Sequence, residues 1–115
     1  MGQLLKNKMA EIKKYIDTHI CKIIYVNEIA NIFKIDKNIL DEQFKMIYDK
    51  SPKEYIIDEK IEKLIIILRE SDDGKICYYY AYKLGYETSS GLCNLIKRKT
   101  GLTFKEFKDQ LLNGP

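Results

Sequence analysis

Apolar residues recur at helical spacing along almost the whole chain. The first series places one apolar stripe on a single face of an opening helix, and it consists of Leu5, Met9, Ile12, Ile16 and Ile20. Shorter series predict further helices over residues 27–33, 39–48, 76–84, 92–96 and 104–111. No useful length of chain alternates with a period of two, so we expect an all-α protein.

A long helix is predicted over residues 53–70. The run Ser51-Pro52-Lys53-Glu54 is typical of a helix start, because serine caps free amides, proline suits the first position and glutamate completes a capping box. From Ile61 to Leu68 the helix is apolar around much of its circumference, as expected for a helix buried between two lobes. A polar turn at Asp72-Asp73-Gly74 is expected to end it.

The two halves of the sequence resemble each other. Ala30 matches Ala81 at an offset of 51 residues, as Phe33 matches Leu84. One extra residue in the second turn raises the offset to 52 for Leu40 with Leu92, Phe44 with Ile96, Lys45 with Lys97, Ser51 with Thr103, Glu54 with Glu106 and Tyr55 with Phe107. Each half is a short helix, a tight turn, a longer helix and a capping box, the order found in a helix-turn-helix. An ordinary duplicated helical bundle is the alternative.

Composition narrows the classes of function. The chain has 115 residues, 45% of them apolar, enough for one compact domain or two small lobes, and its net charge of +3 neither requires nor excludes a polyanionic partner. Cys21, Cys77 and Cys93 form no C-x-x-C pair and are most simply core fillers. His19 has no ligand partner at metal spacing and is interpreted as a contact of helix-end carbonyls. We expect no metal, no cofactor and no disulfide framework.

Enzymatic and membrane functions find little support in the sequence. No nucleophile, base and orienting group converge by their spacing, so we do not expect an enzyme. The chain has no basic-plus-apolar leader and no apolar stretch long enough to cross a bilayer. We therefore expect a soluble cytoplasmic protein with no membrane partner.

The second half carries a pattern that resembles a known family. Tyr80-Ala81-x-x-x-Gly85-Tyr86, then Leu92, Ile96-Lys97, Thr100-Gly101 and Thr103-Phe104-x-Glu106-Phe107, is similar to the signature of the AraC/XylS transcription regulators. The first half fits through Ile29-Ala30, Leu40, Phe44-Lys45, Ser51 and Tyr55, so the resemblance covers roughly residues 10–110. Lys60 and Leu64 depart from it, since arginine and alanine are usual there.

The resemblance implies an all-α fold of about seven helices with two helix-turn-helix subdomains. It divides the chain into a first subdomain (1–52), a linker helix (53–70) and a second subdomain (71–115). The two recognition helices would enter adjacent major grooves on one face of double-stranded DNA, and RNA polymerase is a further expected partner. Such a domain is typically attached to a sensing or dimerisation region, so we expect the chain to be a fragment of a longer bacterial regulator, with a naturally short single-domain activator as the alternative.

The candidate DNA-binding residues lie on the two longer helices. Those of the first half are Lys37, Asn38, Asp41, Glu42 and Lys45, and those of the second half are Thr88, Ser89, Ser90, Asn94, Lys97, Arg98 and Lys99. Residues 34–50 carry four lysines against four acidic residues, whereas residues 87–108 carry five basic residues against two acidic ones. We therefore expect the second helix to be the better DNA reader, with the basic run on phosphates and the polar residues on base edges.

Two alternatives compete with this hypothesis. Serine and threonine at the start of the second helix could serve only as caps, and the basic run could be a solvated face. Asp41 and Glu42 would repel phosphates, although a carboxylate can accept from cytosine N4. These carboxylates motivate a second hypothesis, a protein-interaction module with a degenerate helix-turn-helix fold that no longer reads DNA.

Overall fold

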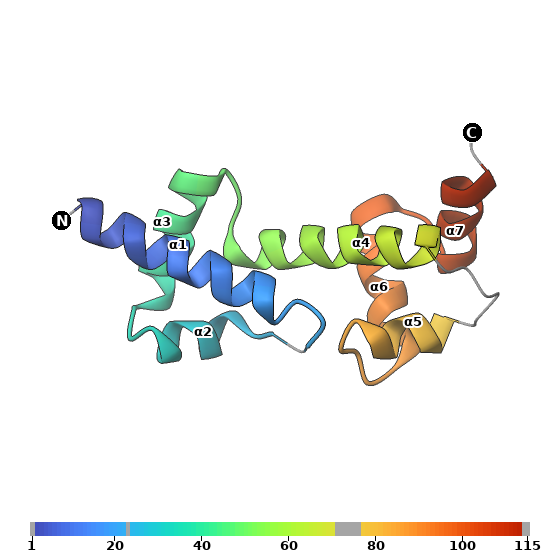
Figure 1. Cartoon of the computed structure of the whole chain (residues 1–115), viewed down its shortest axis with the longest axis horizontal. Helices are drawn as coiled ribbons and strands as arrows, with labels where there is room; N and C mark the ends of the chain where they lie inside the picture. Colours follow the sequence, from blue (N-terminus) through green and yellow to red (C-terminus); the bar gives the residue numbers. More distant parts are fainter. Residues whose placement is uncertain (1, 23, 71–76, 114–115) are drawn as a thin grey trace. The chain divides into compact units, whose positions relative to one another are not determined.

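The computed structural model describes residues 2–22, 24–70 and 77–113, and these residues form helices and no strand (Figure 1). In chain order the elements are α1 (Gly2–Thr18), α2 (Val26–Ile32), α3 (Lys37–Tyr48), α4 (Pro52–Glu70), α5 (Cys77–Lys83), α6 (Ser89–Thr100) and α7 (Phe104–Asn113). The prediction of an all-α fold with about seven helices is confirmed. The expected turn at Asp72-Asp73-Gly74 and the expected helical residue Ile76 lie outside the described residues.

The chain divides into two compact units, Met1–Asp58 and Glu59–Pro115. The first contains α1, α2, α3 and the start of α4, and the second contains the rest of α4 with α5, α6 and α7. Residues 53–70, expected to form a separate linker helix, are thus shared between the units.

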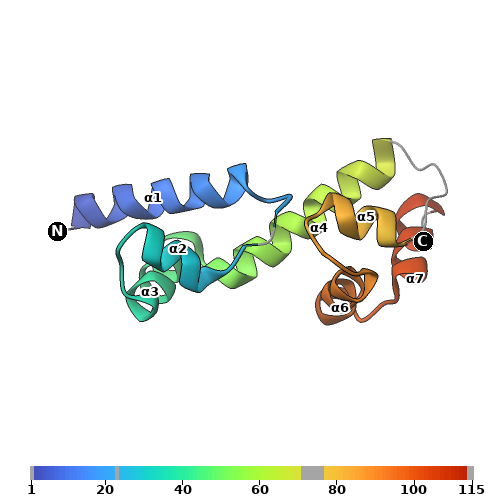
Figure 2. The same ribbon diagram turned by 90° about the horizontal axis from the view of Figure 1, so that it is seen from below.

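The first unit is built around one apolar core. Figure 2 shows α2 and α3 on the same side of α1. The buried residues of this core come from all four helices: Met9, Ile12, Ile16, Ile29, Ala30, Leu40, Phe44, Tyr55 and Ile56. Ala30 of α2 is part of this core, and its small side chain suits close packing of α2 against its neighbours. Burial of this set supplies the main driving force for folding the unit.

The second unit repeats this arrangement with α4 in the role of α1. Three buried residues of α4 follow those of α1 at a constant offset of 52 residues: Met9 with Ile61, Ile12 with Leu64, and Ile16 with Leu68. They are joined in the second unit by the buried residues Tyr80, Ala81, Leu84, Leu92, Leu95 and Ile96. The duplication therefore extends one helix further toward the N-terminus than the sequence comparison had found.

The turns of the two units match at the level of the backbone. Lys34 (φ 53°) and Gly85 (φ 89°), which are 51 residues apart, both adopt the left-handed conformation that stops a helix. In each turn an amide donates five residues back, from Ile35 to the Ala30 carbonyl and from Tyr86 to the Ala81 carbonyl, at 2.9 Å in both cases. Helix, turn and helix are thus the same construction in both units.

The ends of the longer helices and the starts of the next ones also correspond. Asp49 (φ 65°) and Gly101 (φ 78°), 52 residues apart, end α3 and α6 in the left-handed conformation. The capping box predicted before α7 has both of its hydrogen bonds, whereas the one before α4 has the bond to the serine hydroxyl and a hydroxyl–carboxylate bond in place of the second. The Glu54 amide donates to the Ser51 hydroxyl at 3.2 Å, and the Glu106 amide donates to the Thr103 hydroxyl at the same distance.

Candidate nucleic-acid interface

The start of α3 is fixed by an aspartate cap. The Asp36 carboxylate accepts hydrogen bonds from the amides of Asn38 and Ile39 at 2.9 and 3.3 Å, which satisfies donors that have no partner within the helix. Leu40 and Phe44 are buried and turn the helix so that its opposite face is exposed. The exposed positions at helical spacing are Asn38, Glu42, Lys45 and Met46, which we call the outer face of α3.

The two acidic residues predicted to face DNA have different surroundings. Asp41 is half-buried and forms an ion pair with Lys37 on its own helix, with 3.1 Å between Nζ and Oδ2. This pair balances the charge of Asp41 locally, so the carboxylate opposes a polyanion less than the sequence suggested. Glu42 is exposed and lies on the outer face. The repulsion argued from the sequence therefore rests mainly on Glu42.

The start of α6 is built differently from that of α3. Thr88 occupies the N-cap position in an extended conformation (φ −134°, ψ 157°), and its side chain forms no capping hydrogen bond. The interpretation of this threonine as a helix cap is therefore wrong. Ser89 is half-buried, while Ser90 and Asn94 are exposed one turn apart. Because Leu92, Leu95 and Ile96 are buried on the opposite side, these polar side chains point away from the core.

The last turn of α6 carries three consecutive basic residues, Lys97, Arg98 and Lys99, all of them exposed. The pKa of the Glu106 carboxyl is lowered, mainly by the hydrogen bond that it accepts from the Thr103 amide. Lys97 lies close enough for its positive charge to add to this lowering. The exposed residues Ser90, Asn94, Lys97 and Arg98 follow one another at helical spacing, and we call them the outer face of α6.

Gly91 is a residue whose role the sequence analysis missed. A Cβ atom placed on Gly91 would lie 2.7 Å from Cδ1 of Tyr86, a separation that real side chains do not tolerate. The first turn of α6 therefore lies closer to Tyr86, in the turn between α5 and α6, than a residue with a Cβ atom at position 91 would allow. A glycine inside a helical pattern is a recognisable signal of such a contact, although it does not identify the partner.

Tyr86 is itself held in place by Lys60. This buried lysine, 4% exposed, donates from Nζ to the carbonyl of Leu84 at 2.7 Å and lies 5.2 Å from the centre of the Tyr86 ring. Burial raises the pKa of the Tyr86 hydroxyl. A lysine at this position thus supports the turn that leads into α6, which gives the departure from the family pattern at residue 60 a structural role.

Some apolar residues of α3 are not where the sequence pattern placed them. Ile39 and Ile47 belong to the apolar series that predicted a helix over residues 39–48, and they are 46% and 36% exposed. Met46 on the same helix is 74% exposed. Leu40 and Phe44 define the buried side of α3, so Ile39, Met46 and Ile47 fall on its exposed sides.

The cysteines were expected to be core fillers, and the structure places them differently. Cys21 is exposed, so its interpretation as a core filler is wrong. Cys77 and Cys93, which are 16 residues apart in the sequence, are both half-buried with their sulfur atoms 3.3 Å apart. Neither the spacing nor the composition of the chain had indicated this approach.

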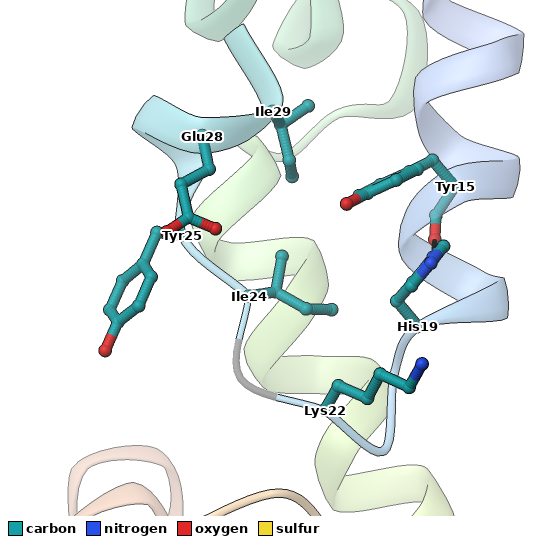
Figure 3. Close-up of a pocket in the computed structure, with 7 residues that line it drawn as sticks. All are labelled: Tyr15, His19, Lys22, Ile24, Tyr25, Glu28 and Ile29. Atoms are coloured by element: carbon teal, nitrogen blue, oxygen red, sulfur yellow. Dashed lines mark hydrogen bonds between the residues drawn. The ribbon is translucent and has the colours of Figure 1, made fainter. Parts of the chain in front are cut away.

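His19 borders a small hollow of about 170 Å³ in the first unit (Figure 3). The ring of His19 stacks on Tyr15 at 4.1 Å between centroids, and Nδ1 lies 2.8 Å from the Tyr15 carbonyl oxygen. This contact confirms the interpretation of His19 as a partner of a carbonyl near a helix end.

Within the described ranges no group of three or more histidine, cysteine, aspartate or glutamate residues could hold a metal ion. In the same part of the chain no helix combines the length and apolar character needed to span a membrane.

Several solved structures share the arrangement of these helices. The C-terminal domain of AraT, a response regulator from Geobacillus stearothermophilus, superposes with a TM-score of 0.77 at 15% identity over 90% of this chain and 84% of that one. The DNA-binding domain of AdpA, a global transcriptional factor crystallised with a target DNA, gives 0.73 at 17% identity over 87% and 88%. A transcriptional regulator of the AraC type from Chromobacterium violaceum gives 0.71 at 14% identity over 96% of both chains.

The sequence itself is far from these proteins. No protein-family model matches the chain, and neither does any curated protein sequence. At 14–17% identity, the structural similarity over nearly the whole length shows that the fold is shared, and it shows no more than that. The chain has the fold of an AraC-type DNA-binding domain, with two helix-turn-helix subdomains built from seven helices in the part that the structure describes.

Proposed function

We propose that this chain binds double-stranded DNA in a sequence-specific manner, without cofactor or catalytic activity, as the DNA-binding domain of a bacterial transcription regulator. The observation that carries the proposal is the outer face of α6. This face is polar in its first half, at Ser90 and Asn94, and basic in its last turn, at Lys97 and Arg98. It belongs to the second helix of a helix-turn-helix, the element that enters the major groove in proteins of this architecture.

The two halves of this face suit two kinds of DNA contact. Ser90 and Asn94 offer short hydroxyl and amide groups, and an asparagine can bind the N6 and N7 edge of adenine with two hydrogen bonds. Lys97, Arg98 and Lys99 supply charge to phosphates, which gives affinity and salt dependence with little sequence information. Thr88, whose hydroxyl is not engaged in capping, and Ser89 complete the polar end of the site.

We assign α3 a weaker, supporting role. Asn38 and Lys45 are exposed on its outer face and suit a base edge and a phosphate respectively. The carboxylate of Glu42 is compatible with DNA only where it accepts a hydrogen bond from cytosine N4 in the major groove. Lys37 and Asp41 are engaged with each other, so neither is a strong contact in its own right. In this proposal α3 and α6 enter successive major grooves of one duplex.

The similar structures support a place for the domain in a larger regulator. AdpA was crystallised with a target DNA, and the domains of AraT and of YesN from Fusobacterium nucleatum are C-terminal parts of response regulators. We propose that the present domain likewise works in the cytoplasm, joined to a sensing or dimerisation region and in contact with RNA polymerase. The first and second helix-turn-helix subdomains would then act together as a DNA-binding pair.

The test is in vitro selection of bound duplexes from a random pool, followed by titration of the selected duplex by fluorescence anisotropy. We expect affinity to fall steeply with rising salt and Arg98→Ala to weaken binding by about 10- to 100-fold, the range for loss of one charge-assisted hydrogen bond to a phosphate. Arg69→Ala is the matched control, because Arg69 is also exposed, belongs to the same unit and lies outside both outer faces. Equal affinity of Arg98→Ala and the parent chain would reject the site.

The outer face of α3 supports a second candidate function. Met46 and Ile39 are exposed apolar residues beside the exposed carboxylate of Glu42, a composition better suited to a protein surface than to a phosphate backbone. A protein-interaction module that has lost DNA reading would enrich no DNA sequence in the same selection, even at low salt.

A further inference from the structure

Cys77 and Cys93 bring two thiols together inside the second unit. Cys77 is the first residue of α5, and Cys93 lies in the first half of α6. Their sulfur atoms are 3.3 Å apart, and Cys77 Sγ also lies 3.9 Å from the Ser89 carbonyl oxygen on the first turn of α6. Both residues are half-buried, so a small reagent can reach them while bulk solvent is partly excluded.

We propose that Cys77 and Cys93 form a redox-reactive pair that a low-molecular-weight disulfide converts to a reversible intramolecular disulfide. A disulfide requires sulfur atoms about 2.0 Å apart, so the two must approach by roughly 1.3 Å. Cys77 stands at the very start of its helix, where a side-chain rotation and a small shift of the first turn can supply this movement. The thiols are 16 residues apart in the chain, and the bond would join two helices of one helix-turn-helix.

The two thiols are not equivalent as nucleophiles. Burial, together with the hydrogen bond and the charge of the neighbouring Cys93, raises the pKa of the Cys77 thiol to about 12. The thiolate is the attacking form, so the raised pKa makes Cys77 a slow first nucleophile. Once the Cys93 sulfur is bonded, its part in raising the pKa of Cys77 disappears, which favours the second step.

The reaction is a pair of thiol–disulfide exchanges. The Cys93 thiolate attacks one sulfur of the small disulfide, forms a mixed disulfide and releases the other half as a thiolate, which takes up a proton. Cys77 then loses its proton to solvent, attacks the Cys93 sulfur and releases the second small thiol. Two protein thiols are oxidised, one small disulfide is reduced to two thiols, and excess small thiol drives the reverse reaction.

Closing this loop constrains the unfolded second unit. The cross-link would enclose α5, the turn and the first half of α6, and such loops stabilise a fold chiefly by restricting the unfolded chain. We therefore expect the oxidised form to unfold at a temperature several degrees higher than the reduced form.

The experiment uses the full chain carrying Cys21→Ser, which removes the exposed thiol that would form intermolecular bonds. The reduced protein is incubated with oxidised glutathione and followed by intact mass, peptide mapping and thermal unfolding, without DNA. We expect a species lacking two hydrogens, a peptide linking Cys77 to Cys93, a raised melting temperature, and reversal by dithiothreitol. Because no duplex is present, the result is independent of whether the chain binds DNA.

Three outcomes would overturn the proposal: two thiols that stay free, stable glutathione adducts on each cysteine without a cross-link, or bonds between chains only. Adding Cys93→Ser to the same chain should abolish both the loss of hydrogens and the rise in melting temperature. If that variant does not fold, the oxidation of the Cys21→Ser chain alone still decides the matter.

Discussion

The outer face of α3 carries Asn38, Glu42, Lys45 and Met46, whereas the equivalent positions of α6, 52 residues later, carry Ser90, Asn94, Lys97 and Arg98. Both helices have 12 residues, both expose these positions, and both end in a left-handed residue. The backbone is therefore shared and the chemistry is not. One face is neutral with an exposed methionine, and the other carries two adjacent cations.

The duplicated fold and the chemistry of the exposed helix faces are therefore set by separate groups of residues. The buried positions Leu40 and Phe44 match Leu92 and Ile96 in apolar character, because packing constrains them in both units. The exposed positions carry no packing constraint and have diverged in charge. A helix-turn-helix backbone alone is thus a weak guide to DNA reading, and the exposed side chains decide it.

The largest effect is expected when α6 is given the outer face of α3. We expect Asn94→Glu combined with Arg98→Met to weaken binding of the selected duplex by 100-fold or more, roughly 3 kcal/mol, because one cation is lost and one anion is added. Fluorescence anisotropy at fixed salt measures this change. Both side chains are exposed, so the thermal unfolding curve should stay close to that of the parent chain.

The reciprocal exchange sharpens the comparison. Glu42→Asn combined with Met46→Arg gives α3 the asparagine and the arginine of the α6 outer face, and it should tighten binding and steepen the salt dependence. If instead the α6 exchange has no effect and the α3 exchange alone changes affinity, the assignment of the main reading helix is reversed.

The next effect concerns the stability of the two units. Gly91 in α6 and Ile39 in α3 are equivalent positions, but the glycine is pressed against Tyr86 while Ile39 is 46% exposed. We expect Gly91→Ala to destabilise the second unit by about 1–3 kcal/mol through overpacking, and Ile39→Ala to change stability by about 0.5 kcal/mol or less. Urea unfolding followed by circular dichroism measures both.

A double variant tests the cause of the Gly91 effect. Tyr86→Leu removes the ring that the new methyl group would strike, so Gly91→Ala should cost less in that background than in the parent chain. Equal costs in both backgrounds would show that the contact with Tyr86 does not explain the glycine.

The helices and the repeat could be predicted because each has a local signal. Periodic apolar residues, capping boxes at Ser51 and Thr103, and glycines at positions 85 and 101 all act over a few residues. The signal was weaker where the first unit uses Lys34 and Asp49 in place of glycine for the same left-handed turns. There the equivalence became visible only through the dihedral angles.

The parts that escaped prediction depend on packing between helices. Nothing near Cys77 indicates Cys93, since the approach of the two sulfurs is produced by the α5–α6 contact. The support of Tyr86 by Lys60 likewise joins residues from different elements. For the proposed site, most of the candidate residues named from the sequence lie at exposed positions, but the sequence could not reveal that Asp41 pairs with Lys37 or that Thr88 forms no capping hydrogen bond.

The smallest expected effect is the pH dependence of the stability that the second capping box contributes. In the second unit the Glu106 carboxylate accepts from the Thr103 amide at 3.0 Å, whereas in the first the Glu54 carboxylate accepts from the Ser51 hydroxyl at 3.1 Å. The amide hydrogen bond lowers the pKa of Glu106 from its ordinary value of 4.5. A lowered folded-state pKa means that the ionised carboxylate favours the fold, so its contribution is present above pH 4.5 and is lost as the pH falls through the lowered pKa. We therefore expect Glu106→Gln to lower the melting temperature slightly at pH 7 and not at pH 2.5, with Glu87→Gln, an exposed carboxylate outside any capping box, as the control for net charge. A deficit of the same size at both pH values would mean that Glu106 acts through packing and not through its charge.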